Sequence, residues 1–158
     1  MTVLSPRVDL DTAAGLVRVG GEGLPEVVVT RTGEGETDDA IPVGTRDPAR
    51  LRLTVDGREA ELRPAKGRLS RRSFRVDAVV DGVAYRLVPC SYAESRLSRD
   101  GRVLGRLDCT GDGRVGAEWD TEPGPADLAI GTALAAAFGT GAAPWWEILA
   151  QMLAELIP

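Results

Sequence analysis

The chain has 158 residues, the length of one domain, and its 43% hydrophobic and 27% charged residues exclude a disordered or fibrous protein. A chain of this length can bury a core without help from disulfides or metals. It contains no histidine, which excludes Ser-His-Asp and Cys-His nucleophilic sites and the common histidine-based zinc and iron sites.

The net charge of −5 is unevenly distributed along the chain. Residues 1–44 carry 3 basic and 8 acidic side chains, residues 45–114 carry 16 and 10, and residues 115–158 carry none and 6. An acidic protein is a poor general nucleic-acid binder because phosphate contacts need a positive field. We therefore expect no nucleic-acid partner, although the basic middle can still form a local patch.

The cysteines and the N-terminal sequence indicate the cellular compartment of the protein. Cys90 and Cys109 are too few and too far apart for a metal-ligand signature or a CxxC pair, so two core thiols are favoured over a disulfide. The start, MTVLSPRVDLDTAAG, lacks a basic residue followed by an apolar run and does not resemble a signal peptide. We therefore expect a cytoplasmic protein.

The first fifty residues contain two plausible strands, Leu16–Val19 and Val27–Thr30, followed by an acidic, glycine-rich segment, 32–39, that we expect to be an exposed loop. From Arg50 onward, apolar and polar residues alternate up to Trp119. This alternation is interrupted by Asp-Gly at four places, and Asp-Gly favours the type I′ turns of β-hairpins. The four pairs are Asp56-Gly57, Asp81-Gly82, Asp100-Gly101 and Asp112-Gly113. The pattern predicts an antiparallel meander of about seven strands, with two or three more from the N-terminal region.

The stretch 126–138, ADLAIGTALAAAF, is charged only at Asp127. A helix that is apolar on all sides must be buried, and Pro125 suits its first turn. We therefore predict a mainly β, α+β fold in one domain over residues 1–158. Its strands occupy about residues 15–120 and close into a barrel around this central helix.

A second helix is predicted over 145–157, with a narrow polar stripe formed by Glu147, Gln151 and Glu155 and a wide apolar side. Such a side packs on the barrel, on another subunit or on a membrane, and we predict self-association through it. The uncharged run 128–146 is long enough for a membrane anchor. Its glycines and Pro144, and the absence of Lys and Arg after Arg114, favour a buried helix instead.

No phosphate-binding glycine loop is present, so no nucleotide or other cofactor is predicted. Residues 108–113, DCTGDG, resemble the start of a calcium loop, but the twelfth position is Trp119 rather than glutamate. A hairpin turn is favoured there, and no metal site is predicted. Glu118 and Asp120 lie two apart on a predicted strand and therefore share a face. They are either a catalytic carboxylate pair, as in a hydrolase, or the solvent side of the strand.

The most suggestive polar segment is 63–75, which holds six cations and no acid. Such a cluster can hold a phosphate-bearing ligand or an anionic membrane surface. It can equally be a solvated loop and strand edge, where positive charge discourages edge pairing. The candidate anion- or lipid-binding residues are Arg63, Lys66, Arg68, Arg71, Arg72 and Arg75.

The order of hairpins, a tryptophan-bearing last strand and an apolar helix resembles the tubby C-terminal-like superfamily, which includes tubby proteins, phospholipid scramblases and LURP-one-related proteins. The residues that carry the resemblance span about 50–138 and are Ser73–Val76, Ser98–Gly105, Ala117–Asp120 and Asp127–Ala136. The resemblance implies a closed barrel around a central helix. Tubby proteins bind phosphoinositides through basic residues and scramblases are membrane-associated, so it also implies a possible lipid partner. The helix 145–157 is an addition to that pattern.

These observations together predict a non-enzymatic binding or scaffold module of unknown ligand. One alternative is a peripheral membrane protein that binds anionic phospholipid through residues 63–75. Another is a hydrolase that uses Glu118 and Asp120, and a third is an open barrel that holds an apolar ligand. The last of these requires that the helix 126–138 does not fill the interior.

Overall fold

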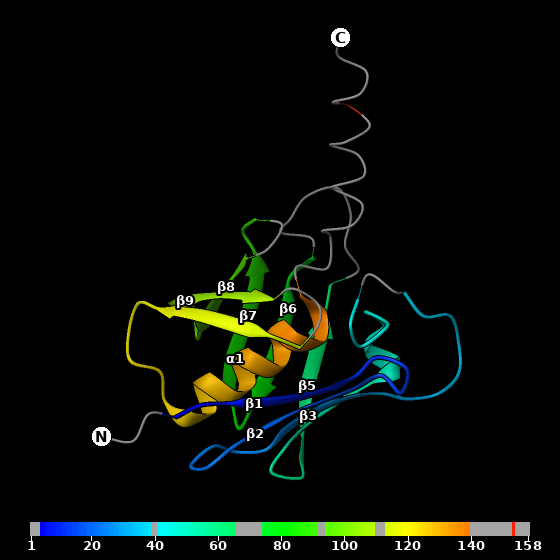
Figure 1. Ribbon diagram of the computed structural model, residues 1–158, viewed down its shortest axis with the longest axis horizontal. Helices are drawn as coiled ribbons and strands as arrows, with labels where there is room; N and C mark the ends of the chain where they lie inside the picture. Colours follow the sequence, from blue (N-terminus) through cyan, green and yellow to red (C-terminus); the bar gives the residue numbers. More distant parts are fainter. Residues whose placement is uncertain are drawn as a thin grey trace.

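The computed structural model describes residues 4–38, 41–65, 74–91, 94–109, 113–139 and Leu153. Ten antiparallel strands form one sheet in which each strand pairs with the next along the chain, and the sheet curls around a single helix, α1 (Figure 1). The strands are β1 (Arg7–Asp11), β2 (Leu16–Gly20), β3 (Val27–Arg31), β4 (Leu51–Val55), β5 (Arg58–Pro64), β6 (Val76–Val80), β7 (Val83–Pro89), β8 (Glu94–Arg99), β9 (Arg102–Cys109) and β10 (Val115–Trp119). The predicted meander is confirmed: seven strands follow Arg50 and three precede it.

Asp-Gly turns set the register of the hairpins. Asp56, Asp81 and Asp100 have φ near +50°, and the glycine after each has φ near +80°, the pair of left-handed conformations that a type I′ turn requires. The carboxylates of Asp56 and Asp100 also accept backbone N–H groups, from Glu26 at 2.8 Å and from Ala84 at 2.9 Å. The fourth predicted turn falls partly outside the described residues, because Asp112 is not among them.

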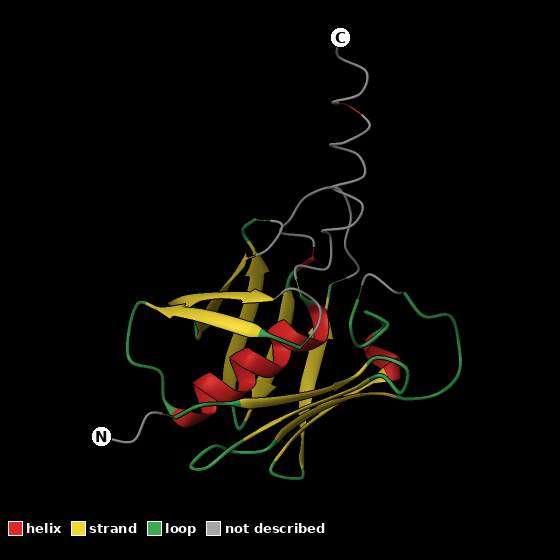
Figure 2. Cartoon of the chain, viewed as in Figure 1, coloured by secondary structure: helices red, strands yellow, loops and turns green. Residues whose placement is uncertain are grey.

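Helix α1 (Pro125–Phe138) confirms the predicted central helix and lies in the hollow of the sheet (Figure 2). Pro125 occupies its first turn, and Gly139, with φ of +56°, ends it. Every residue from Asp127 to Phe138 is buried. Side chains from both halves of the sheet pack on the helix, since α1 contacts β1, β2 and β3 on one side and β7, β8, β9 and β10 on the other. The helix fills the interior, which removes the open-barrel alternative for an apolar ligand.

Small residues allow the helix and sheet to approach closely. A Cβ atom added to Gly131 of α1 would lie 2.6 Å from Cδ2 of Leu97 on β8, closer than two carbons can pack. Ala129, Ala133 and Ala136 are all fully buried on the same helix. The short side chains of α1 are therefore a packing requirement of a narrow interior.

The segment 41–46 covers the C-terminal end of α1, and the sequence had not suggested this. Ile41 and Val43 are buried, and the backbone N–H of Val43 donates to the carbonyl of Ala137 on α1 at 3.0 Å. Arg31 at the end of β3 fixes this segment by donating from Nη1 to the carbonyl of Val43 at 3.0 Å and from Nη2 to Ala13 at 2.9 Å. Gly44 has a φ of +95°, which side-chain-bearing residues rarely adopt, and an added Cβ atom would also displace Nη1 of Arg31.

The closed barrel and the second helix, both predicted from the sequence, are only partly covered by the described residues. The closed barrel is confirmed only as a strongly curled sheet, because β1 and β10 are the two edge strands of the sheet order. The second helix, 145–157, lies outside the described residues except for Leu153, which is helical and 54% exposed. No helix within the described part of the chain is long and apolar enough to cross a membrane.

Candidate functional site

Arginines gather on the outer face of the curled sheet, over β6, β7 and β8. Side chains alternate between the two faces of a strand, so the burial of Val76, Ala78, Leu87 and Leu97 in the core turns their neighbours outward. The strand register then places outward residues side by side. One row across β5, β6, β7 and β8 is Arg63, Asp77, Arg86 and Ser98, and Arg96 on β8 lies opposite Val88 on β7 and Arg106 on β9.

An open groove with a volume of about 500 Å³ lies on this outer face, and we call it the arginine groove. Its lining residues are Arg75, Arg86, Val88, Arg96 and Ser98. No acidic residue is among them. Three guanidinium groups and one hydroxyl therefore face the same space, and each guanidinium offers several N–H donors in a planar array that suits phosphate or carboxylate oxygens.

Asp77 holds two of these arginines together. Its carboxylate accepts from Nε of Arg86 at 2.6 Å and from Nη2 at 3.3 Å, and Nε of Arg75 lies 3.7 Å away. The hydrogen bond to Asp77, and then its negative charge, raises the pKa of Arg86. The three guanidinium groups of Arg75, Arg86 and Arg96 and the single carboxylate of Asp77 together carry a net charge of +2. Arg96 forms no ion pair within the described part of the chain, so its guanidinium is available to an anion.

A second hollow, with a volume of about 540 Å³, adjoins the arginine groove and shares Arg86 and Ser98 with it. It extends over β5, β6 and β7 towards the β8–β9 turn. The residues that it adds are Glu61, Arg63, Asp77, Ala78, Val79, Ala84, Tyr85, Asp100 and Gly101. Both hollows lie on the outer face of the sheet, on either side of Arg86 and Ser98.

The predicted basic segment leads to this face but only its two ends are described. Arg75 lines the arginine groove, whereas Arg63 lines the second hollow and lies 3.6 Å from Glu61. The other four candidates, Lys66, Arg68, Arg71 and Arg72, lie outside the described residues. Sequence reasoning missed Arg86 and Arg96, which stand 11 and 21 positions after Arg75 in the chain. Their only signal is the register of the hairpins, in which both occupy outward positions.

A buried arginine fixes the two ends of the basic segment. Arg46 is 8% exposed and donates from Nε to the carbonyl of Ala65 at 2.7 Å and from Nη2 to the carbonyls of Phe74 and, at 3.3 Å, Arg75. Its guanidinium also lies 5.4 Å from the ring of Phe74 and 5.6 Å from that of Phe138, within the range of cation–π attraction. Burial lowers the pKa of Arg46 to about 10, although Asp38 opposes the shift, so the side chain stays cationic at neutral pH.

Another buried charge ties β7 and β8 to the start of α1. Asp127 is 3% exposed, and its carboxylate accepts from Tyr85 Oη at 2.7 Å, from Arg99 Nη1 at 2.6 Å and from the backbone N–H of Gly124 at 3.0 Å. Burial by itself raises the pKa of Asp127, but these hydrogen bonds outweigh burial and leave the pKa below its usual value. Burial, and then the hydrogen bond with Asp127, raises the pKa of Tyr85, which keeps its hydroxyl proton available as the donor.

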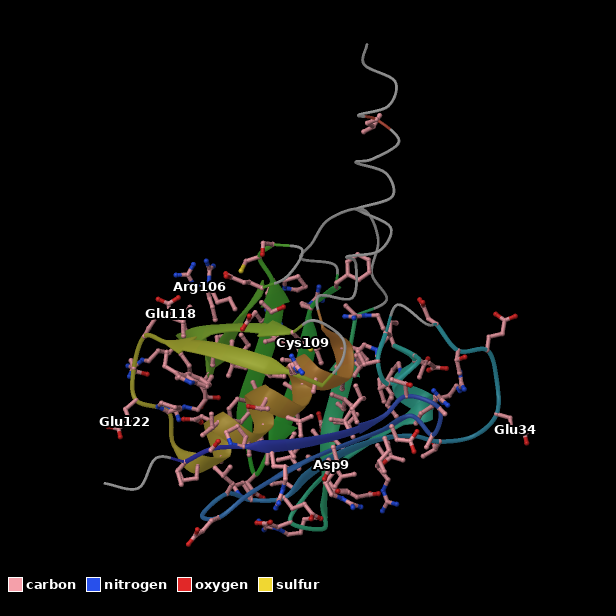
Figure 3. All side chains as sticks on the ribbon, in the orientation of Figure 1. Asp9, Glu34, Arg106, Cys109, Glu118 and Glu122 are labelled. Carbon is pink, nitrogen blue, oxygen red and sulfur yellow. The ribbon has the colours of Figure 1, made fainter. Side chains whose placement is uncertain are left out.

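The other predicted chemistry finds less support from the geometry. Glu118 and Asp120 are both exposed, and Glu118 lies opposite Arg106 of β9 in the strand register (Figure 3). Glu118 lines a hollow of about 360 Å³ whose lining does not include Asp120. The catalytic pair stays a prediction. No group of three or more potential metal ligands occurs in the described ranges, and residues 110–112 of the calcium-like sequence lie outside them.

Cys90 and Cys109 are both half-buried thiols that do not form a disulfide with each other, and Cys109 packs against the core. Comparison of the chain with known protein families, with curated proteins and with solved structures gave no match.

Proposed function

We propose that this protein is a non-enzymatic binding module that holds a phosphate-bearing or similar anionic ligand in the arginine groove. The observation that carries the proposal is the convergence of Arg75, Arg86 and Arg96 on one open space with a single carboxylate, Asp77, between them. Charge-assisted hydrogen bonds from arginine to phosphate are roughly twice as strong as neutral ones, and a fork of N–H donors adds directionality.

The rest of the molecule supports a rigid site. The groove floor belongs to central strands of a ten-stranded sheet, and its inner face packs on α1. Ser98 and Val88 sit between the arginines and leave room for a ligand. The acidic parts of the chain, 1–44 and 115–158, give the protein its net charge of −5, so the attraction for anions is local to this face.

Two sources supply the same phosphate chemistry: the headgroup of an anionic phospholipid and a free phosphate compound. If the ligand is a lipid headgroup, the protein is a peripheral membrane protein. In the sequence, the basic residues Lys66, Arg68, Arg71 and Arg72 shortly precede Arg75 of the arginine groove. Anionic membrane surfaces attract clustered basic residues by about 1 kcal/mol for each nearby charge. The soluble source corresponds to a cytoplasmic protein that binds a small molecule.

The finer architecture is part of the proposal. A tubby-like closed barrel is supported by the approach of the two sheet edges, since a Cβ added to Gly113 before β10 would lie 3.4 Å from Cβ of Leu10 on β1. A second helix over 145–157 with self-association through its apolar side is proposed from sequence alone. Equilibrium sedimentation of the full chain, compared with a chain truncated after Gly139, tests that association.

The binding test removes the charge of one arginine of the groove, Arg96. Arg96→Gln removes an exposed guanidinium that makes no ion pair in the described structure, so the fold should be unaffected. Arg18→Gln is the matched control, because Arg18 is also exposed on the outer face of a strand, β2, in the other half of the sheet. Binding is measured at low salt to inorganic phosphate by calorimetry and to phosphatidylcholine vesicles containing phosphatidylserine by flotation.

We expect Arg96→Gln to weaken the affinity for the anion about tenfold, because one strong charge-assisted contact is lost. Arg18→Gln should change that affinity less than twofold. Binding to phosphate without flotation identifies a soluble ligand, and Arg96-dependent flotation identifies the lipid headgroup. Absence of both, or an equal effect of the two substitutions, contradicts the proposed function.

A further inference from the structure

The second hollow differs from the arginine groove in its chemistry. It exists because outward positions there carry short side chains, Ala84, Ser98 and Gly101, while longer side chains such as Glu61, Arg63 and Arg86 surround them. Long charged residues fill most of the outer face of the sheet, so short residues at adjoining positions leave an open volume of about 540 Å³.

Part of the surface of this hollow is apolar. Val79 on β6 is 36% exposed and is one of three large hydrophobic residues that are exposed among the described ones, with Val103 and Leu153. The strand register places Val79 directly opposite Ala84 on β7. An exposed valine beside an alanine, within a face of charged residues, offers a ligand apolar surface that water now covers.

The charges of the two hollows differ in sign. The lining of the arginine groove has three guanidinium groups and no acid, whereas that of the second hollow has three carboxylates and two guanidinium groups, those of Arg63 and Arg86. Glu61 lies 3.6 Å from Arg63, and the carboxylate of Asp100 accepts the N–H of Ala84. Asp77, the third carboxylate of the second hollow, accepts a hydrogen bond from Arg86. A second anionic group on the same ligand would meet these carboxylates and be repelled.

From this arrangement we infer that the ligand is a small organic anion in which one phosphate or carboxylate is joined to an apolar body. The anionic group binds Arg75, Arg86 and Arg96, and the apolar body lies over Val79 and Ala84. Arg86 and Ser98, which line both hollows, mark where the two parts of the ligand join. This inference rests on the proposed function and specifies the class of compound that the site selects.

The test compares phenyl phosphate with inorganic phosphate in calorimetric titrations of the full chain at one pH and salt concentration. Val79→Ser removes apolar surface without adding charge. Val103→Ser is the matched control, since Val103 on β9 is 39% exposed, close to the 36% of Val79, and does not line either hollow. Both substitutions are at exposed positions and are expected to leave the fold intact.

We expect phenyl phosphate to bind about tenfold more tightly than inorganic phosphate, because the ring removes apolar surface from water. Val79→Ser should reduce the affinity for phenyl phosphate about three- to tenfold and leave that for inorganic phosphate within twofold, and Val103→Ser should change neither. A second variant, Ala84→Leu, fills the hollow and should likewise weaken only phenyl phosphate.

Each outcome separates the two proposals. Equal affinities for the two probes, with binding still dependent on Arg96, overturn the inference about the apolar body and leave the proposed function standing. An equal effect of Val79→Ser and Val103→Ser also overturns it. Failure of both probes to bind overturns this inference, and it overturns the proposed function as well when Arg96-dependent flotation of the lipid vesicles is also absent.

Discussion

At the scale of single residues, two buried charged side chains, Asp127 and Arg46, each connect separate segments of the chain by hydrogen bonds. Asp127 gathers donors from β7, β8 and the turn before α1 onto one buried carboxylate, which fixes the angle at which the helix enters the sheet. Arg46 supplies donors to three backbone carbonyls beside Phe74. A buried polar group costs free energy unless it is hydrogen-bonded, so such clusters determine a unique arrangement when they are satisfied.

We predict that Asp127→Asn lowers the free energy of unfolding by about 2–3 kcal/mol at pH 7, because the amide cannot accept from Arg99 and Tyr85 as strongly as the carboxylate. The folded-state pKa of Asp127 is lowered, so its stabilisation is fully present above the unfolded pKa of about 3.9 and is lost as the pH falls through the folded value.

Urea unfolding of the native chain and of Asp127→Asn at a series of pH values measures this. The difference between the two proteins should be constant from about pH 6 to 8 and should shrink below about pH 4. A difference that stays constant on acidification would show that the carboxylate charge is not the stabilising feature.

At the scale of elements, the hairpins and the helix were predictable because each has a local signal. Asp-Gly pairs favour type I′ turns, which require the left-handed φ angles found at Asp56, Asp81 and Asp100. The run 126–138, which is charged only at Asp127, favoured an interior helix. Strand β1 alternates polar and apolar residues, but it is short and only Val8 and Leu10 are apolar, and it precedes the range of about 15–120 in which strands were predicted.

The segment 41–46 carries no periodic signal at all, because its burial depends on contacts with Ala137 and Arg31, which are distant in the chain. The position of this segment therefore could not be predicted from the pattern of its own residues.

The packing of α1 leads to a direct prediction. Ala133→Leu and Ala136→Leu should each destabilise the fold by about 1–3 kcal/mol, because both alanines are fully buried and added methyl groups must displace neighbours. Ala126→Leu is the matched control, since Ala126 is on the first turn of the same helix but is exposed. Thermal unfolding of the three variants measures the effect, and a melting temperature equal to the native one for Ala133→Leu would show that the helix is not enclosed.

At the scale of the whole molecule, curvature separates two kinds of surface. The inner face of the sheet holds the helix (Figure 1). The strand register brings Arg86 and Arg96, which are ten residues apart in the chain, onto the same outer face over β7 and β8. The sequence indicated this face through the cation-rich segment 63–75. It did not indicate Arg86 or Arg96, because a cross-strand cluster is visible only after the hairpins are aligned.

A phosphate titration followed by two-dimensional NMR of the isotope-labelled chain tests whether the arginine groove is the anion-binding site of this protein. We expect saturable shifts in the amide signals of residues 75–77, 86–88 and 96–98 and in the Nε–H signals of Arg75, Arg86 and Arg96. The signals of β2 and β3 should be unchanged. Shifts that are absent, or that are spread evenly over exposed arginines such as Arg18 and Arg52, would contradict the assignment of the groove as that site.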